Sequence, residues 1–82
     1  MIAREELLQR FRAIASKVAE REVAVGSADT AIADLGLDSL NLLEIIGEME
    51  KEFRIRIPDD QLVGITTVAQ LVDLVYRRLP QG

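Results

Sequence analysis

The chain has 82 residues, enough for one small domain, and 49% of them are hydrophobic against 29% charged, which is typical of a folded protein rather than a disordered one. It contains no Cys and no His, which excludes disulfides, a Cys/His metal site and a histidine general base, and argues against an enzyme. Ten basic and fourteen acidic residues give a net charge of −4, and residues 29–60 carry −6 from three basic and nine acidic side chains, so we expect no binding to nucleic acid or to anionic membranes.

The first predicted helix covers about residues 4–20. Spacings of four, three and four residues separate the members of its apolar stripe, which are Leu7, Phe11, Ile14 and Val18. Residues 21–38 follow as a loop that is long for so small a chain. We expect Ile32, Leu35 and Leu37 to pin this loop to the core. A short turn is expected to start at Asp29-Thr30.

The second predicted helix covers about residues 39–53. Its core stripe is expected to consist of Leu42, Ile46, Met49 and Phe53, with Ile45 at the edge. At 100° per residue, Leu40 falls about 160° from Leu42, and Leu43 falls about 100° from it. Leu40 therefore points away from the core beside the polar Ser39, and Leu43 lies on the shoulder of the stripe. Two apolar residues in such a place indicate a contact surface.

The segment after the second helix contains an alternating pattern and a short turn. Residues 53–57 alternate like a strand, but the sequence offers no second run with which a strand could pair. We therefore interpret them as an extended loop whose isoleucines point inward. Residues 59–63 predict a single short helical turn, with Asp59 as its candidate cap.

The last predicted helix covers about residues 67–79. Thr67 and Gln70 have the spacing of a capping box at its start, and Pro80 ends it. The prediction is an all-α fold, a small four-helix bundle of three main helices plus one short helix. No linker, signal segment or membrane-length apolar run is visible, so we expect a single domain over residues 1–82 that is monomeric and cytoplasmic.

Ser39 stands where the second helix is expected to begin. Gly36, three residues earlier, permits a tight turn before the helix. Two interpretations of this serine are open. Its hydroxyl could cap the helix by accepting a backbone N–H. Alternatively, the unpaired N–H groups and partial positive charge of a helix start suit a phosphate ester on the serine. A hydrolytic role is disfavoured because no His or Cys is present to activate the hydroxyl or replace it.

The motif Leu-Gly-Leu-Asp-Ser-Leu at residues 35–40 resembles the attachment motif of acyl carrier proteins. Glu52-Phe53, Ile57-Pro58-Asp59 and Ile65-Thr66-Thr67-Val68 extend the resemblance over nearly the whole chain. It implies that Ser39 bears 4′-phosphopantetheine, taken from coenzyme A by a phosphopantetheinyl transferase, with Asp38 as its motif neighbour. The thiol of that arm would hold acyl groups as thioesters. On this resemblance the chain is a carrier on which enzymes act.

The resemblance also implies where partner enzymes dock, because in this family they contact acidic and apolar positions of the second helix. In this sequence the matching positions are Leu40, Asn41, Leu43, Glu44, Gly47, Glu48 and Glu50. The expected partners, besides the transferase, are acyl-loading, condensing or tailoring enzymes. The apolar cleft behind the helix is expected to shelter the acyl chain.

Several features depart from fatty-acid carriers, which usually have a stronger negative charge. Asn41 and Lys51 stand where acids are common, Gly47 stands where a larger apolar residue is common, and Arg54 and Arg56 add positive charge. These differences favour a dedicated carrier in a specialised pathway, such as polyketide assembly, over a housekeeping fatty-acid role. An aminoacyl or peptidyl carrier stays an alternative, although an Asp before the serine is less typical of it. A helical interaction module without a prosthetic group would explain the amphipathic helices but not the motif.

Overall fold

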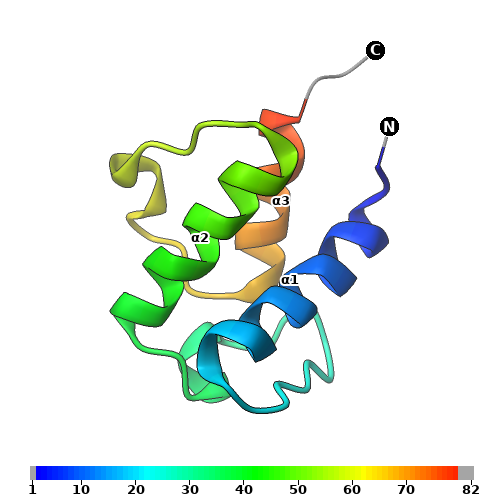
Figure 1. Cartoon of the computed structure of the whole chain (residues 1–82), viewed down its shortest axis with the longest axis vertical. Helices are drawn as coiled ribbons and strands as arrows, with labels where there is room; N and C mark the ends of the chain where they lie inside the picture. Colours follow the sequence, from blue (N-terminus) through cyan, green and yellow to red (C-terminus); the bar gives the residue numbers. More distant parts are fainter. Residues whose placement is uncertain (1, 80–82) are drawn as a thin grey trace.

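The computed structural model describes residues 2–79, so the predicted stop at Pro80 lies outside the described residues. In chain order the elements are α1 (Arg4–Ala19), the 3₁₀ helix η1 (Ile32–Leu35), α2 (Ser39–Phe53), the 3₁₀ helix η2 (Asp59–Leu62) and α3 (Val68–Arg78). Figure 1 shows α1 reaching across the lower part of the bundle, where it packs against both α2 and α3. The predicted all-α class is confirmed. The short element expected near residue 59 is a 3₁₀ turn, and η1 was not predicted.

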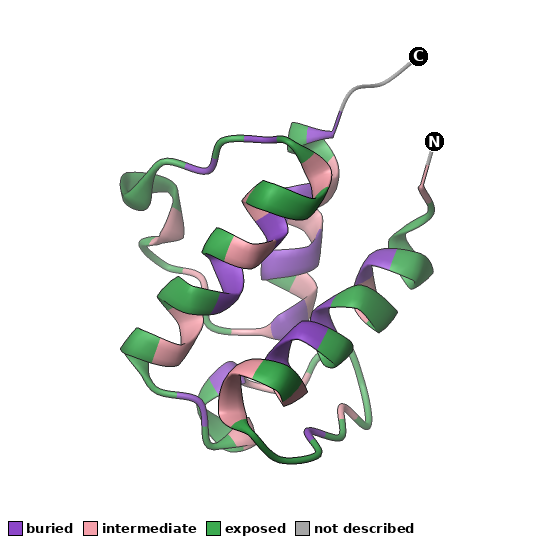
Figure 2. Cartoon of the chain, in the orientation of Figure 1, coloured by how far each residue is buried: buried purple, intermediate pink, exposed green. Residues whose placement is uncertain are grey.

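The buried residues of the three helices form one core cluster. Figure 2 shows in purple where buried residues lie along each helix. Leu7 and Phe11 of α1 are completely buried, whereas Val18, expected in the same stripe, is only half-buried. Removing a large apolar side chain from water stabilises a fold by roughly 1.5–3 kcal/mol. Within residues 2–79, no helix is both long enough and apolar enough to cross a membrane.

The buried face of α2 is rotated from the predicted stripe. Ile45, expected at the edge, is completely buried, whereas Leu42 and Phe53 are only half-buried. The reason is the position of α1, whose charged residues pair with Glu48 and Glu52 of α2. Glu48 and Glu52 lie three and seven residues after Ile45, on the same side of the helix. Since α1 covers that side of α2, the burial is centred nearer to Ile45 than the apolar pattern alone predicts.

The ion pair between Arg10 of α1 and Glu52 of α2 joins the two helices through two hydrogen bonds. Arg10 Nε donates to Glu52 Oε2 and Arg10 Nη2 donates to Glu52 Oε1, both at 2.6 Å. These hydrogen bonds, more than the charge attraction, lower the pKa of the Glu52 carboxyl and raise the pKa of Arg10. Because both side chains are largely exposed, the pair positions the helices more than it stabilises the fold.

The long loop before α2 is held by the chain that leads into α3. Ile32 N–H donates to Thr66 O at 2.8 Å and Val68 N–H donates to Thr30 O at 3.0 Å, around an isolated antiparallel bridge. Leu37 and Ile32 are buried in the core, as expected for a pinned loop. Pairing between two segments so far apart in sequence has no local signature, so sequence reasoning missed it.

The segments around η2 and the start of α3 show one correction and one agreement. The N-cap position of η2 is Pro58, and Asp59 is its first helical residue, so the expectation that Asp59 caps this turn is wrong. Pro58 occupies the cap position because its ring favours the extended backbone that precedes the turn. Thr67 caps α3, and Gln70 N–H donates to Thr67 Oγ1 at 3.2 Å while Gln70 Oε1 accepts from Thr67 N–H at 3.0 Å. This is the capping box that the sequence predicts.

Candidate functional site

Ser39 is the first residue of α2 and its side chain is exposed. Two features of the preceding loop place it there. Gly36 ends η1 in the left-handed conformation, at φ 76°, which few other residues adopt without strain. One residue later, Leu37 is buried and anchors the chain in the core. The serine is therefore presented by a short connection that is fixed at both ends.

Arg21 braces the same connection from the end of α1. Its guanidinium Nη2 donates a hydrogen bond to the backbone oxygen of Leu35. It also lies so close to Gly36 that a Cβ there would come within 2.7 Å of Arg21 Nη2. Glycine is needed at this position for its backbone conformation, and a side chain there would also displace the end of Arg21 from its present place. The brace was not predicted, because nothing in the sequence links Arg21 to the motif.

Asp38, rather than Ser39, caps α2. Asn41 N–H donates to Asp38 Oδ1 at 2.8 Å, and Asn41 Oδ1 accepts from Asp38 N–H at 3.2 Å, so the two residues form a capping box. The interpretation of Ser39 as the N-cap is therefore wrong. The signal that sequence reasoning missed is the interval of three residues from Asp38 to Asn41 at a helix start.

The consequence is an unused hydroxyl at a helix start. Ser39 Oγ makes no hydrogen bond with any of residues 2–79, and neither do the backbone N–H groups of Ser39 and Leu40. A phosphate ester on Ser39 would find these unpaired N–H groups and the positive end of the helix dipole beside it. The residues present therefore fit a phosphate-linked prosthetic group. Residues 2–79 contain no cluster of three or more carboxylates placed to hold a metal ion.

Two open clefts flank Ser39, and Leu42 lies between them. The first, of about 240 Å³, is lined by Ala31, Ile32, Ala33, Leu37, Asp38, Ser39, Leu42, Ile65 and Thr66. The second, of about 300 Å³, is lined by Ser39, Leu42, Leu43, Asp59, Leu62 and Val63. Both are lined mainly by apolar side chains. A flexible arm leaving Ser39 has apolar surface within reach on either side.

The seven predicted docking residues differ in exposure. Leu40 is 64% exposed and Leu43 is 50% exposed, as expected for side chains outside the core. Glu44 and Gly47 are also exposed, whereas Asn41, Glu48 and Glu50 are half-buried. Among the large apolar side chains of residues 2–79, Val63 has the largest exposed fraction, 83%, and sequence reasoning did not single it out. The one signal in the sequence that could have identified Val63 is its place as an apolar residue at the end of a short helical turn.

Two of the half-buried acids already have partners within the chain. Glu50 Oε2 accepts a hydrogen bond from the Ile57 N–H at 2.8 Å, which holds the extended segment after α2 against the helix. Glu48 Oε2 lies 3.9 Å from Lys17 Nζ of α1. Contact of Glu48 and Glu50 with partner enzymes stays a prediction. Glu44 has neither kind of partner among residues 2–79.

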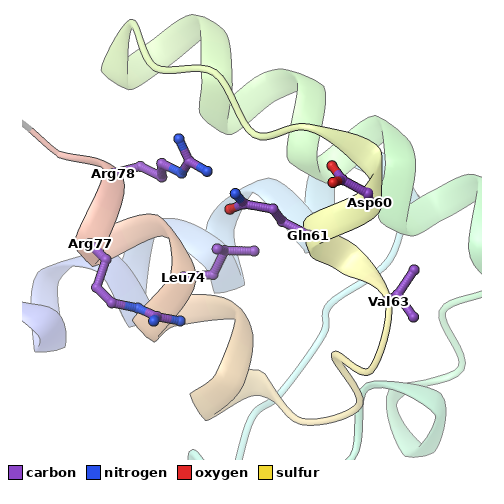
Figure 3. Close-up of a pocket in the computed structure, with 6 residues that line it drawn as sticks. All are labelled: Asp60, Gln61, Val63, Leu74, Arg77 and Arg78. Carbon is purple, nitrogen blue, oxygen red and sulfur yellow. The ribbon is translucent and has the colours of Figure 1, made fainter.

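A larger cleft, of about 450 Å³, lies away from the serine. Figure 3 shows it between η2 and the second half of α3, lined by Asp60, Gln61, Val63, Leu74, Arg77 and Arg78. Arg77 Nε lies 3.3 Å from Asp73 Oδ2, so one of the two arginines is already paired. This cleft contains no group with an evident chemical role. The volume of a cleft is therefore a poorer guide to the site than the geometry around Ser39.

Comparison with known proteins agrees with this geometry. Residues 9–75 match the family of the phosphopantetheine attachment site. The chain is 34% identical over 80 residues to an acyl carrier protein of Thermotoga maritima, covering 96% of this chain and 99% of that protein. It is also 34% identical over 74 residues to a non-reducing polyketide synthase of Emericella nidulans, covering 90% of this chain but only 3% of the synthase.

Two solved structures have the same arrangement of helices. The crystal structure of an acyl carrier protein from Thermotoga maritima matches with a TM-score of 0.84 and 28% identity, over 92% of this chain and 88% of that one. The solution structure of the acetyl actinorhodin acyl carrier protein from Streptomyces coelicolor matches with a TM-score of 0.68 and 25% identity, over 94% and 90%. The resemblance seen in the sequence is confirmed, and the chain belongs to the acyl carrier protein family, whose members bear phosphopantetheine.

Proposed function

We propose that Ser39 is the residue that bears 4′-phosphopantetheine and that a phosphopantetheinyl transferase attaches the group there. The observation that carries this proposal is the exposed Ser39 hydroxyl, unused by the protein, at the start of α2 between two apolar clefts. In the transfer, the Ser39 oxygen bonds to phosphorus as its proton leaves. The pyrophosphate bond of coenzyme A breaks, and the adenosine bisphosphate half departs. Since Ser39 Oγ has no hydrogen-bond partner among residues 2–79 that could accept this proton, the transferase supplies the base.

The test is the intact mass of the chain after incubation with coenzyme A and a phosphopantetheinyl transferase. We expect the mass of one phosphopantetheine group to be gained by the wild-type chain and not by Ser39→Ala. Ser27→Ala is the matched control, because Ser27 is also exposed but lies in the loop after α1. No gain by the wild type, or a gain that persists in Ser39→Ala, would overturn the assignment.

The function that follows is the carriage of acyl intermediates. When bound, the prosthetic group supplies a thiol that holds an acyl group as a thioester, and the clefts on either side of Leu42 offer apolar surface to a short acyl chain. The relatives named above are acyl carriers or a polyketide synthase. They favour an acyl cargo, including a polyketide, over the aminoacyl or peptidyl alternative. The cytoplasmic location and the single domain over residues 1–82 stay predictions.

Partner enzymes dock on the exposed side of α2 in this proposal. Leu40, Leu43 and Val63 provide exposed apolar surface beside Ser39. Glu44 is exposed on the same helix and has no hydrogen-bond or ion-pair partner among residues 2–79, so it is available to a basic residue of the enzyme. Such contacts make association weak, fast and dependent on salt. Val63 joins the seven predicted positions as an eighth.

The docking proposal is tested by Glu44→Lys, with Glu6→Lys as the matched control. Both changes raise the net charge by two, but Glu6 lies in the first turn of α1, away from Ser39. We expect Glu44→Lys to slow the transferase and the acyl-loading enzyme well beyond any change in melting temperature. Equal slowing by both variants would point to net charge rather than to a docking contact.

A further inference from the structure

The helix that presents Ser39 could begin in either of two registers. Asp and Ser are among the best N-cap residues and differ little in capping strength, and here they are adjacent at positions 38 and 39. In the observed register Asp38 is the cap and Leu42 N–H donates to Asp38 O at 2.9 Å. In the alternative register Ser39 would be the cap, and its hydroxyl would accept a hydrogen bond from Leu42 N–H. The hydroxyl would then be turned back onto the helix.

Asn41 distinguishes the two registers. It lies three residues after Asp38, where its side-chain oxygen accepts the Asp38 N–H at 3.2 Å and completes the capping box. If Ser39 were the cap, the equivalent position would be Leu42, which has no side-chain acceptor. The second hydrogen bond of the box is therefore available in the observed register alone. That bond favours the register in which the Ser39 hydroxyl is unused.

We propose that Asn41 is a positioning residue for the modification of Ser39. Its side chain holds the Asp38 N–H and thereby selects the helix start that leaves the serine hydroxyl available to the transferase. This inference rests on the proposed function, because it concerns the same serine. It assigns to Asn41 a task within the isolated chain, in addition to any contact with a partner enzyme.

The experiment compares Asn41→Ala with Asn41→Gln and with Gln70→Ala. Gln is a common residue at this position of a capping box and preserves the reciprocal acceptor. Gln70 is the equivalent residue of the box at the start of α3. Its Oε1 accepts the Thr67 N–H and also the N–H and hydroxyl of Thr66, so Gln70→Ala removes the same type of bond, together with two others, at a different helix start. Two quantities are measured for each variant, the rate of mass gain with transferase and coenzyme A, and the hydrogen exchange of the Asp38 amide without transferase.

We expect Asn41→Ala to lower kcat/KM for the transferase by up to about twofold, because two caps of nearly equal strength would then be about equally populated. The Asp38 amide should exchange about twofold to tenfold faster, which is the effect of losing one hydrogen bond of ordinary strength. Asn41→Gln should retain the wild-type values of both quantities. Gln70→Ala should leave both unchanged although it loses at least as much stability, because three hydrogen bonds end on Gln70 Oε1. An unchanged rate in Asn41→Ala would overturn the inference. So would slower modification with unchanged amide exchange, since Asn41 would then act through contact with the enzyme alone.

Failure of the inference is distinguishable from failure of the proposed function. A wild-type chain that gains no mass overturns the assignment of Ser39 and the inference with it. A wild-type chain that is modified, together with an Asn41→Ala variant that is modified equally fast, overturns the inference alone.

Discussion

Replacing Gly47 with alanine is expected to stabilise the fold. Gly47 lies in the middle of α2 and is exposed, and a Cβ placed there meets no heavy atom within 4 Å. The methyl group therefore neither clashes with anything nor fills a cavity, so the effect reduces to helix propensity. Glycine inside a helix costs about 0.8–1 kcal/mol relative to alanine, because its backbone loses more freedom on folding. The free energy of unfolding should rise by about 1 kcal/mol, which corresponds to about 4–8 °C in Tm for a domain of this size.

Urea and thermal unfolding followed by circular dichroism measure this change, with Gly64→Ala as the control. Gly64 also has open space around its Cβ position, but its φ of 87° is unfavourable for alanine. Gly64→Ala should therefore destabilise the fold, by about 1–2 kcal/mol. An unchanged or lower stability of Gly47→Ala would refute the reasoning that Gly47 lies unstrained in a regular, open stretch of helix.

The same variant also tests whether partners approach α2 at Gly47. The added methyl group changes the exposed surface without disturbing the fold, so any slowing of the transferase or of an acyl-loading enzyme reports a close contact. We expect partner reactions to slow although the carrier becomes more stable. Unchanged rates would remove Gly47 from the set of docking residues.

Two further predictions concern the contacts between α1 and α2. Ile45→Ala should lower the free energy of unfolding by about 2–5 kcal/mol, and Leu42→Ala by less than half as much, because Ile45 is completely buried and Leu42 borders open clefts. Equal losses in urea unfolding would contradict the rotated core face of α2. Arg10→Gln should cost no more than about 1 kcal/mol near neutral pH, since the side chains of the pair are 44% and 35% exposed. The folded pKa of Glu52 is lowered from the 4.5 of an unperturbed carboxyl. The stabilisation by the pair is therefore fully present above pH 4.5 and is lost as the pH falls through the folded pKa. Urea unfolding of the wild type and of Arg10→Gln from about pH 7 to about pH 3 should show the difference between their free energies of unfolding disappear at the acid end. A difference that does not depend on pH would contradict this account.

The helices of this protein are predictable because each carries its own signals. The apolar period of α2 spans residues 39–53, and the helix is found at Ser39–Phe53. The spacing of Thr67 and Gln70 predicts the capping box of α3, and this box is present in the structure. Such signals act between residues three or four positions apart, so a single sequence contains them in full. The motif around Ser39 is equally local, which is why the family could be inferred before the fold.

Other features depend on residues that are distant in the sequence. Arg21 braces the turn at Gly36 across an interval of fifteen residues, and the loop before α2 pairs with the start of α3. The rotation of α2 toward Ile45 follows from the side on which α1 packs. No periodicity in one segment encodes where another segment will lie against it.

The sequence thus establishes the three α-helices and their approximate lengths, the absence of thiol and imidazole side chains, and the serine that stands at a helix start. Whether the Ser39 side chain is exposed was decided by the folded chain, because Gly36 and the buried Leu37 place the start of the helix. The capping box between Asp38 and Asn41, which leaves the Ser39 hydroxyl unused, is by contrast a local signal that the sequence contains. The clefts beside the serine likewise exist because η2 and the loop before α2 come to lie next to it. Propensity acts along the chain, whereas exposure and cleft shape arise from segments that meet only after folding.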